Sequence, residues 1–155
     1  MIDAAKYGDV NITKIFVKYA SENCTEDDKY RYTPLIYAAV NGQMEVVHVL
    51  LEGGANAERA NAFQSTALHY AAWDGYLDVC RLLLDWEATV DPLNESKNTP
   101  LHLAAWGGHL SVVKLLVERG ADVRLKNTNG QTASDVARKW GRKAVAEWLD
   151  SVSRV

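Results

Sequence analysis

Histidine and cysteine are the residues of this sequence best suited to bind a metal or to act as nucleophiles. They are His48, His69, His102, His109, Cys24 and Cys80. A zinc site requires His, Cys or carboxylate ligands at short spacings such as H-x-x-x-H, and no two histidines are spaced in this way. The sequence also lacks G-x-S-x-G, G-x-x-x-x-G-K-[ST] and G-x-G-x-x-G, the motifs of a nucleophilic serine and of two phosphate-binding loops. These observations predict that the protein is not an enzyme and that it binds no metal and no cofactor.

The composition is typical of a globular domain without a membrane segment. The chain has 155 residues, a hydrophobic content of 48% and a formal net charge of −3. A net negative charge provides no attraction to nucleic-acid phosphates, and no apolar run is long enough to cross a bilayer or to form a secretion signal. We therefore expect a cytoplasmic or nuclear protein that binds neither nucleic acid nor membrane. Cys24 and Cys80 are too few for a disulfide framework, and we expect one loop thiol and one buried apolar side chain.

The strongest signal in the sequence is an internal repeat of 33 residues. Thr33, Thr66, Thr99 and Thr132 are equally spaced and open the segments TPLIYAAVNGQMEVVHVLLEGGA, TALHYAAWDGYLDVCRLLLDWEA, TPLHLAAWGGHLSVVKLLVERGA and TASDVARKWGRKAVAEWLDSV. The earlier segment DAAKYGDVNITKIFVKYA fits the same frame at an offset of 34. Such a period is typical of a solenoid, in which each unit buries its apolar side against its neighbours.

Each unit has the pattern of a helical hairpin. Thr66 can cap the N-terminus of a short helix that carries Leu68 and Ala71 on one face. Gly75 can end this helix before a second one, which begins near Leu77 and is apolar on one side. Alanine pairs at 38/39, 71/72 and 104/105 provide the small side chains that closely packed neighbouring helices require.

With T-P-L-H-x-A-A at Thr99–Ala105 and G-A-D-V at Gly120–Val123, the chain resembles the ankyrin-repeat family over almost its whole length. The resemblance implies a single all-α domain over residues 1–155, an ankyrin-repeat solenoid of stacked helix-turn-helix units with projecting β-hairpin loops. We expect an N-terminal partial repeat at 1–32, full repeats at 33–65, 66–98 and 99–131, and a C-terminal capping repeat at 132–155. The resemblance also implies that His69 and His102 hydrogen-bond the adjacent loop and that the first helices line a concave face.

The last unit is expected to form a polar end cap, because the outer side of a terminal repeat faces water. Ser134 and Asp135 replace the leucine and histidine of the family motif, and Thr132 with Asp135 forms a T-x-x-D capping box. The basic residues of this unit are Arg138, Lys139, Arg142 and Lys143. We interpret them as solvated side chains of the cap, with contact to an acidic partner or a phosphate as the alternative.

Several positions depart from the family's use of glycine. The loop glycine remains at Gly130 and is replaced by Arg31, Gln64 and Lys97 in the other units, which indicates drift or selection for contact rather than ideal turn geometry. Glu87 stands where a glycine follows the second helix in the neighbouring units. A non-glycine residue in the left-handed region costs about 1 to 2 kcal/mol, so we expect strain or another path there. Trp86 is expected to cover the end of its own helix, and a second binding spot is the alternative.

Positions that vary between otherwise similar units are those that the fold does not fix. Seven residues after each threonine stand Val40, Trp73, Trp106 and Lys139, and the next position holds Asn41, Asp74, Gly107 and Trp140. A close-packed core would not accept valine, tryptophan and lysine in turn. We therefore expect these side chains to be exposed at the ends of the first helices, on the concave side that the resemblance implies. The register of Tyr37, Tyr70, Leu103 and Val136 stays apolar, and we assign it to the core.

Aromatic residues in the loops extend this set of candidate contacts. Trp73 and Trp106 share one register on successive helices, which pack roughly 8 to 10 Å apart, so we expect the two indoles to be neighbours. Exposed tryptophan and tyrosine are enriched among residues that dominate binding energy. The predicted partner-binding residues are Tyr30, Tyr32, Val40, Phe63, Trp73, Asp74, Glu95, Trp106 and Trp140. In the alternative interpretation the tryptophans only stack on one another and on loop residues, and thereby stabilise the array.

The sequence favours a monomeric, non-enzymatic protein–protein interaction module that binds a peptide or a partner surface on the concave face and the loops. Its acidic rim would consist of Asp27, Asp28, Asp74 and Glu95, which favours a partner with apolar and basic side chains. One alternative is an inhibitory or regulatory subunit that docks on a larger globular partner. Another is a reader of lysine peptides, similar to histone-tail readers, in which Trp73 and Trp106 attract the cation.

Overall fold

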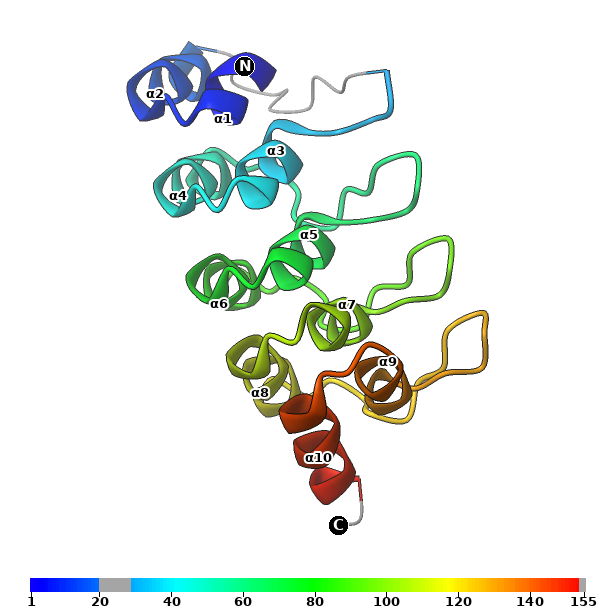
Figure 1. Cartoon of the computed structure of the whole chain (residues 1–155). Coiled ribbons are helices and arrows are strands. Elements are labelled where there is room, and N and C mark those ends of the chain that lie inside the picture. Colours follow the sequence, from blue (N-terminus) through cyan, green and yellow to red (C-terminus); the bar gives the residue numbers. More distant parts are fainter. Residues whose placement is uncertain (20–28, 154–155) are drawn as a thin grey trace.

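The computed structural model describes residues 1–19 and 29–153 of the chain. Helices within these residues are α1 (Ile2–Tyr7), α2 (Val10–Tyr19), α3 (Pro34–Val40), α4 (Met44–Glu52), α5 (Ala67–Asp74), α6 (Leu77–Asp85), α7 (Pro100–Gly107), α8 (Leu110–Glu118), α9 (Ala133–Lys139) and α10 (Lys143–Val152). They are stacked in pairs, and the loops before α5, α7 and α9 project to the same side (Figure 1). The predicted all-helical solenoid is thus confirmed. Cys24, Asp27 and Asp28 lie outside the described residues.

The threonines that mark the period begin the first helix of each pair. The Thr33 hydroxyl oxygen accepts a hydrogen bond from the Ile36 N–H at 3.1 Å. At Thr132 the exchange is mutual, because the Asp135 carboxylate accepts from the Thr132 N–H at 3.0 Å while the threonine oxygen accepts from the Asp135 N–H. These bonds satisfy N–H groups that have no partner inside the helix. The predicted capping box of the last unit is confirmed.

The projecting loops are tight turns that keep the left-handed backbone conformation without glycine. Arg31, Gln64 and Lys97 have φ values of 62°, 57° and 54°, close to the 72° of Gly130. The expectation that these loops give up ideal turn geometry is therefore wrong. An asparagine compensates in the second, third and fourth turns, at Asn61, Asn94 and Asn127. The Asn61 side chain, for example, accepts from the N–H groups of residues 63 and 65 at 3.0 Å each. No regular strand occurs in the described residues, so the hairpins implied by the resemblance are present as turns.

Backbone hydrogen bonds join each loop to the next. The Ala62 N–H donates to the Tyr30 carbonyl at 2.8 Å, and the Glu95 N–H donates to the Phe63 carbonyl at 3.1 Å. The Thr128 N–H continues the series by donating to the Ser96 carbonyl at 3.0 Å. The four loops therefore form a connected row rather than independent tips.

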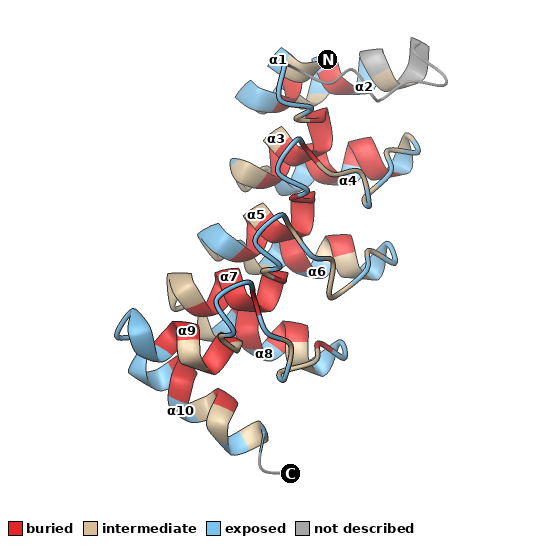
Figure 2. Cartoon of the chain, turned by 90° about the vertical axis from the view of Figure 1, so that its right-hand side faces the viewer, coloured by how far each residue is buried: buried red, intermediate tan, exposed pale blue. Residues whose placement is uncertain are grey.

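The hydrophobic core runs through the whole stack between the first and second helices (Figure 2). Ala38, Ala71 and Ala104 are fully buried, as the predicted role of the alanine pairs requires. Leu103 and Val136 are also buried, in agreement with their predicted core register. Tyr37 and Tyr70 are half-buried rather than buried, and Tyr70 packs against the core, so the predicted core register holds only in part. Both phenol rings contact the Tyr32 ring, and the Tyr70 hydroxyl group is hydrogen-bonded.

Glu87 also adopts the left-handed conformation, with a φ of 61°. The chain therefore accepts the expected strain after α6 and does not take another path. Trp86 ends α6 as its C-terminal cap, and its ring meets the His48 ring edge-on at a centroid distance of 6.3 Å. His48 belongs to α4, so the indole reaches the neighbouring helix rather than covering only the end of its own.

Candidate functional site

Three tryptophans from successive repeats are stacked on one side of the molecule. The ring centroids of Trp73 and Trp106 are 4.6 Å apart, and those of Trp106 and Trp140 are 5.1 Å apart with the ring planes inclined by only 23°. We call Trp73, Trp106 and Trp140 the indole stack. Trp73 is 41% exposed and Trp140 is 49% exposed, whereas Trp106 lies between them and is half-buried. The predicted neighbourhood of Trp73 and Trp106 is confirmed, and Trp140 joins them.

The ends of the first helices position the three rings. Trp73 and Trp106 each occupy the last turn of a first helix, α5 or α7, and Trp140 is the residue that ends α9. Figure 2 shows exposed and half-buried residues at these helix ends, away from the buried N-terminal turns. Trp140 follows Lys139 rather than occupying its register. Although it lies one position later in its repeat, its indole contacts the Trp106 ring and continues the stack.

Side chains at the start of the second helices hold the backbone beneath the stack. His109 Nε2 donates to the Trp73 carbonyl oxygen at 2.9 Å, and Arg142 Nε donates to the Trp106 carbonyl oxygen at 3.0 Å. Gly107 makes the first of these contacts possible, because a Cβ atom there would run into the His109 ring. The sequence comparison missed both anchoring residues. The one sequence signal for the His109 contact is Gly107, a glycine in the register that holds Asn41 and Asp74 in the preceding repeats.

The aromatic residues of the loops form a second, separate surface. Tyr30 and Phe63 are stacked with a centroid distance of 6.5 Å, and both are about half exposed. Phe63 precedes the N-terminus of α5, while Trp73 lies at its C-terminal end. A helix of eight residues is about 12 Å long, so the two aromatic surfaces lie at opposite ends of the first helices. The structure therefore divides the predicted aromatic patch into two parts.

Tyr32 connects the loops to the first helices. Its hydroxyl group lies 2.6 Å from the Tyr70 hydroxyl, which also accepts a hydrogen bond from the Asn61 side-chain amide at 2.8 Å. The Tyr32 ring also contacts Tyr37 at a centroid distance of 5.4 Å. Burial and the Tyr32 hydroxyl raise the pKa of Tyr70 far above its usual range. This cluster of aromatic and polar side chains holds the loops against the first helices.

The remaining predicted site residues are scattered around these surfaces. Val40 is half-buried against the core and Trp106 is half-buried between its neighbours, so the expectation that these two side chains are exposed is wrong. Asp74 is exposed next to Trp73, and partial desolvation raises the pKa of its carboxyl group, an effect that His109 opposes. Glu95 is exposed in the third loop, where its backbone contacts Phe63. Asp74 and Glu95 thus belong to different surfaces and do not form one acidic rim.

His69 and His102 hold the loops, as the resemblance implies. His69 Nδ1 accepts from the Thr66 N–H at 3.1 Å, and its Nε2 donates to the Asn98 carbonyl oxygen at 3.0 Å. His102 makes the equivalent bonds to Thr99 and Gln131. Burial lowers the pKa of His69 to about 4 and also lowers that of His102. Both imidazoles are therefore neutral at pH 7, with their two nitrogens already engaged.

The described residues offer little for catalytic or metal chemistry. Cys80 is buried, and burial raises the pKa of its thiol to about 12, so it is not a thiolate at neutral pH. Within 1–19 and 29–153 no three or more His, Cys, Asp or Glu side chains are grouped to hold a metal ion. Residues of this part of the chain also form no helix long and apolar enough to span a bilayer.

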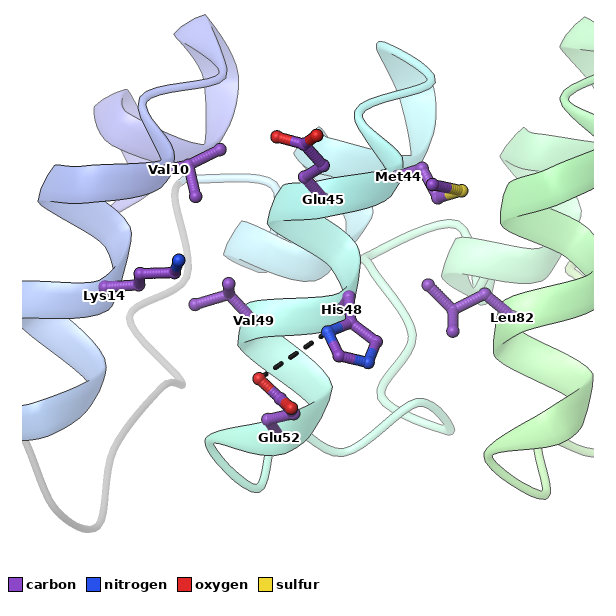
Figure 3. A pocket seen from close by; sticks show the side chains of 8 residues that line it. All are labelled: Val10, Lys14, Met44, Glu45, His48, Val49, Glu52 and Leu82. Atoms are coloured by element: carbon purple, nitrogen blue, oxygen red, sulfur yellow. Dashed lines mark ion pairs between the residues drawn. The ribbon is translucent and has the colours of Figure 1, made fainter.

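A groove of about 570 Å³ lies between the second helices α2, α4 and α6. Figure 3 shows His48 and Glu52 of α4 joined by an ion pair of 3.6 Å, with Lys14 of α2 across the groove. Its apolar walls are formed by Val10, Met44, Val49 and Leu82. The ion pair is exposed on both sides, and such pairs contribute little to stability or affinity. This groove is less distinctive than the indole stack.

Paired helices stacked with a period of 33 residues, capped by threonine and tied together by loop-bonding histidines, define a helical repeat solenoid. The chain belongs to the ankyrin-repeat family. A family model described as ankyrin repeats in three copies matches residues 1–94, and a second, described as ankyrin repeats in many copies, matches residues 89–137. No curated protein is similar enough in sequence to count as a match. Ankyrin repeats are generally protein–protein interaction modules.

Proposed function

We propose that this chain is a non-enzymatic module that binds a partner protein through the indole stack. The observation that carries the proposal is the contact of Trp73, Trp106 and Trp140 in one continuous surface, of which the two outer rings are more than two-fifths exposed. Tryptophan is the residue type most enriched among those that dominate binding energy. A partner that covers the stack would remove a large apolar area from water without distorting the core.

Physical reasoning supports contact against the stack rather than insertion into it. Rings whose centroids are 4.6 Å apart leave no space for a side chain between them. A lysine reader would require the cation to approach the outer face of a ring, within about 6 Å of its centroid. The three rings lie against one another rather than around a space, so we favour a partner with a flat apolar side chain, such as proline or an aromatic residue.

A docked globular partner is the second candidate, and the separation of the two aromatic surfaces favours it. A single short segment cannot easily contact both the indole stack and the Tyr30–Phe63 pair, because the length of a first helix lies between them. A larger partner, including one that this chain would inhibit or regulate, could cover both. Phe63→Ala and Trp106→Ala would then each remove part of the affinity of this chain for such a partner.

Affinity purification with mass spectrometry tests the proposal directly. We expect Trp73→Ala/Trp106→Ala to lose partners that the wild type and the matched control Trp86→Ala retain, because Trp86 is similarly exposed but lies outside the stack. Far-UV circular dichroism must show that all three proteins are folded. Equal recovery of the same partners by the double variant and the wild type would show that the chosen surface is wrong.

A further inference from the structure

The charge around the indole stack differs strongly between its two ends. Asp74 follows Trp73 directly at one end. At the other end, Lys139 directly precedes Trp140 in the sequence, and Arg142 and Lys143 follow it after one residue. All three side chains are exposed. The sequence predicts an acidic rim and a basic partner, but the structure assigns the acidic and basic groups of this surface to opposite ends.

The cations near Trp140 differ in how far the fold already uses them. Arg138 is engaged, because its guanidinium binds Asp135 at 2.9 Å and Asp150 at 2.8 Å. Within the described part of the chain, Lys139, Arg142 and Lys143 form no ion pair. These three positive charges are therefore not neutralised at the end of the stack.

Arg142 is held in place without losing its capacity to bind an anion. Its Nε atom donates to the Trp106 carbonyl oxygen at 3.0 Å, and its aliphatic part lies over Gly108, where a Cβ atom would contact Cδ at 2.8 Å. The Nε contact leaves the two terminal nitrogens of the guanidinium free of that bond, and together they can bind a carboxylate in a bidentate manner. An ordered guanidinium loses less conformational entropy on binding than a mobile one.

We infer that the partner segment carries a carboxylate beside its apolar contact residue, and that this carboxylate lies against Arg142 and Lys139 while the apolar residue covers Trp140 and Trp106. This inference rests on the proposed function and gives the bound segment a direction along the stack. Centroid steps of 4.6 Å and 5.1 Å make the stack about as long as three residues of extended chain, at roughly 3.3 Å each. The acidic side chain therefore falls within one or two residues of the apolar one.

Selection from a display library of random short peptides tests the inference without a known partner. The folded wild-type chain is the bait, and the clones of interest are those that no longer bind Trp106→Ala. In these clones we expect Asp and Glu to exceed Lys and Arg next to proline or aromatic residues by about threefold or more, because rim charges select complementary partners. The bound clones should also be lost more readily as salt is raised.

A charge-reversal pair then locates the contact. Lys139→Glu should weaken the binding of acidic clones about five- to tenfold at low salt, whereas Lys126→Glu, an equal charge change in the loop before α9, should weaken it less than about twofold. Clones that depend on Trp106 but show no acidic preference, or equal effects of the two reversals, would overturn the inference and leave the proposed function standing. A library without any Trp106-dependent clone would count against both.

Discussion

His109 Nε2 donates a hydrogen bond to the carbonyl oxygen of Trp73 across the boundary between two repeats, over a distance of 2.9 Å. The same register is used at two other boundaries, where Gln43 Nε2 donates to the Lys6 carbonyl at 3.1 Å and Arg142 Nε donates to the Trp106 carbonyl. Each side chain stands directly before a second helix and reaches back to the end of the preceding first helix. In a solenoid, such contacts between neighbours provide the coupling that makes the array fold cooperatively.

The glycines of the helix-to-helix turns make room for these side chains. Gly75 has a φ of 79°, and a Cβ atom there would run into the His109 ring. Gly141 has a similar φ of 70°, but nothing lies within 4 Å of the corresponding position. The two glycines therefore have nearly the same backbone conformation and different surroundings.

We expect Gly75→Ala to lower the free energy of unfolding more than Gly141→Ala. Both variants lose about 1 to 2 kcal/mol because alanine is strained in the left-handed region. Gly75→Ala must in addition displace His109 and break its bond to Trp73, which adds about 1 kcal/mol. Urea unfolding at pH 7 measures both variants, and equal losses would mean that the His109 contact contributes nothing.

Stability should decrease as the solution is acidified below pH 6.5. Burial lowers the pKa of His69 to about 4 from an ordinary value of 6.5, so between these values the unfolded chain binds a proton that the folded chain excludes. The contribution of His69 to the free energy of unfolding consequently falls as pH decreases through this window and levels off below about 4. His69 alone contributes a loss of about 2 kcal/mol between pH 6.5 and 5, and His102, whose pKa is also lowered, adds to it.

Urea unfolding at several pH values measures this dependence. His69→Gln should reduce the slope between pH 6.5 and 5, because it removes the group whose pKa burial lowers. Should His69→Gln be too unstable to measure, an NMR titration of the wild-type His69 ring gives the same answer. A His69 ring that titrates near 6.5 in the folded protein contradicts the prediction.

The repeat architecture could be predicted because each of its elements depends on local signals. The capping box of Thr132 and Asp135 predicts the start of a helix, and the period of 33 residues predicts where the equivalent helices of the other repeats begin. The division of the aromatic patch could not be predicted, since it depends on which end of a first helix each residue occupies in space. Tyr32 illustrates the point: its sequence neighbourhood resembles that of Tyr30, but its hydroxyl group is bound to Tyr70.

Contacts between repeats were equally hidden from the sequence. One register of the repeats holds four residues of different chemical types, which are Gln43, Tyr76, His109 and Arg142. Their variation resembles that of unconstrained surface positions. The structure shows that three of them reach the same kind of carbonyl, while the Tyr76 ring covers Gly42. Different side chains of similar length can perform one packing role, and a comparison of residue types alone does not detect it.

Glu87→Gly should stabilise the protein. Glu87 is exposed and has a φ of 61°, a conformation that costs a non-glycine residue about 1 to 2 kcal/mol. Glycine removes this strain, although its greater freedom in the unfolded chain offsets part of the gain, and we expect a net increase of about 0.5 to 1 kcal/mol. Thr89→Gly in the same loop, where φ is not positive, should be destabilising. Thermal unfolding of both variants provides the comparison, and a less stable Glu87→Gly would show that the carboxylate has a compensating contact.

Removal of the central indole should destabilise the fold as well as weaken binding. Trp106 is half-buried between Trp73 and Trp140, so alanine at this position ends two ring contacts and exposes both neighbouring rings. Aromatic pairs contribute about 0.5 to 1.5 kcal/mol each beyond the area that they bury, and we expect a total loss of about 2 to 4 kcal/mol. Trp86→Ala, which loses one ring contact to His48, should cost less than about 1 kcal/mol.

Urea unfolding and circular dichroism together measure this effect. Closely stacked indoles produce an exciton couplet in the far-UV spectrum, which Trp106→Ala should abolish and Trp86→Ala should leave intact. Trp140→Ala should have an intermediate effect on stability, because it ends one stacked contact and leaves Trp73 and Trp106 paired. If Trp106→Ala were as stable as the wild type, the stack would contribute nothing to the array. The contact of the three indoles would then be explained by partner binding alone.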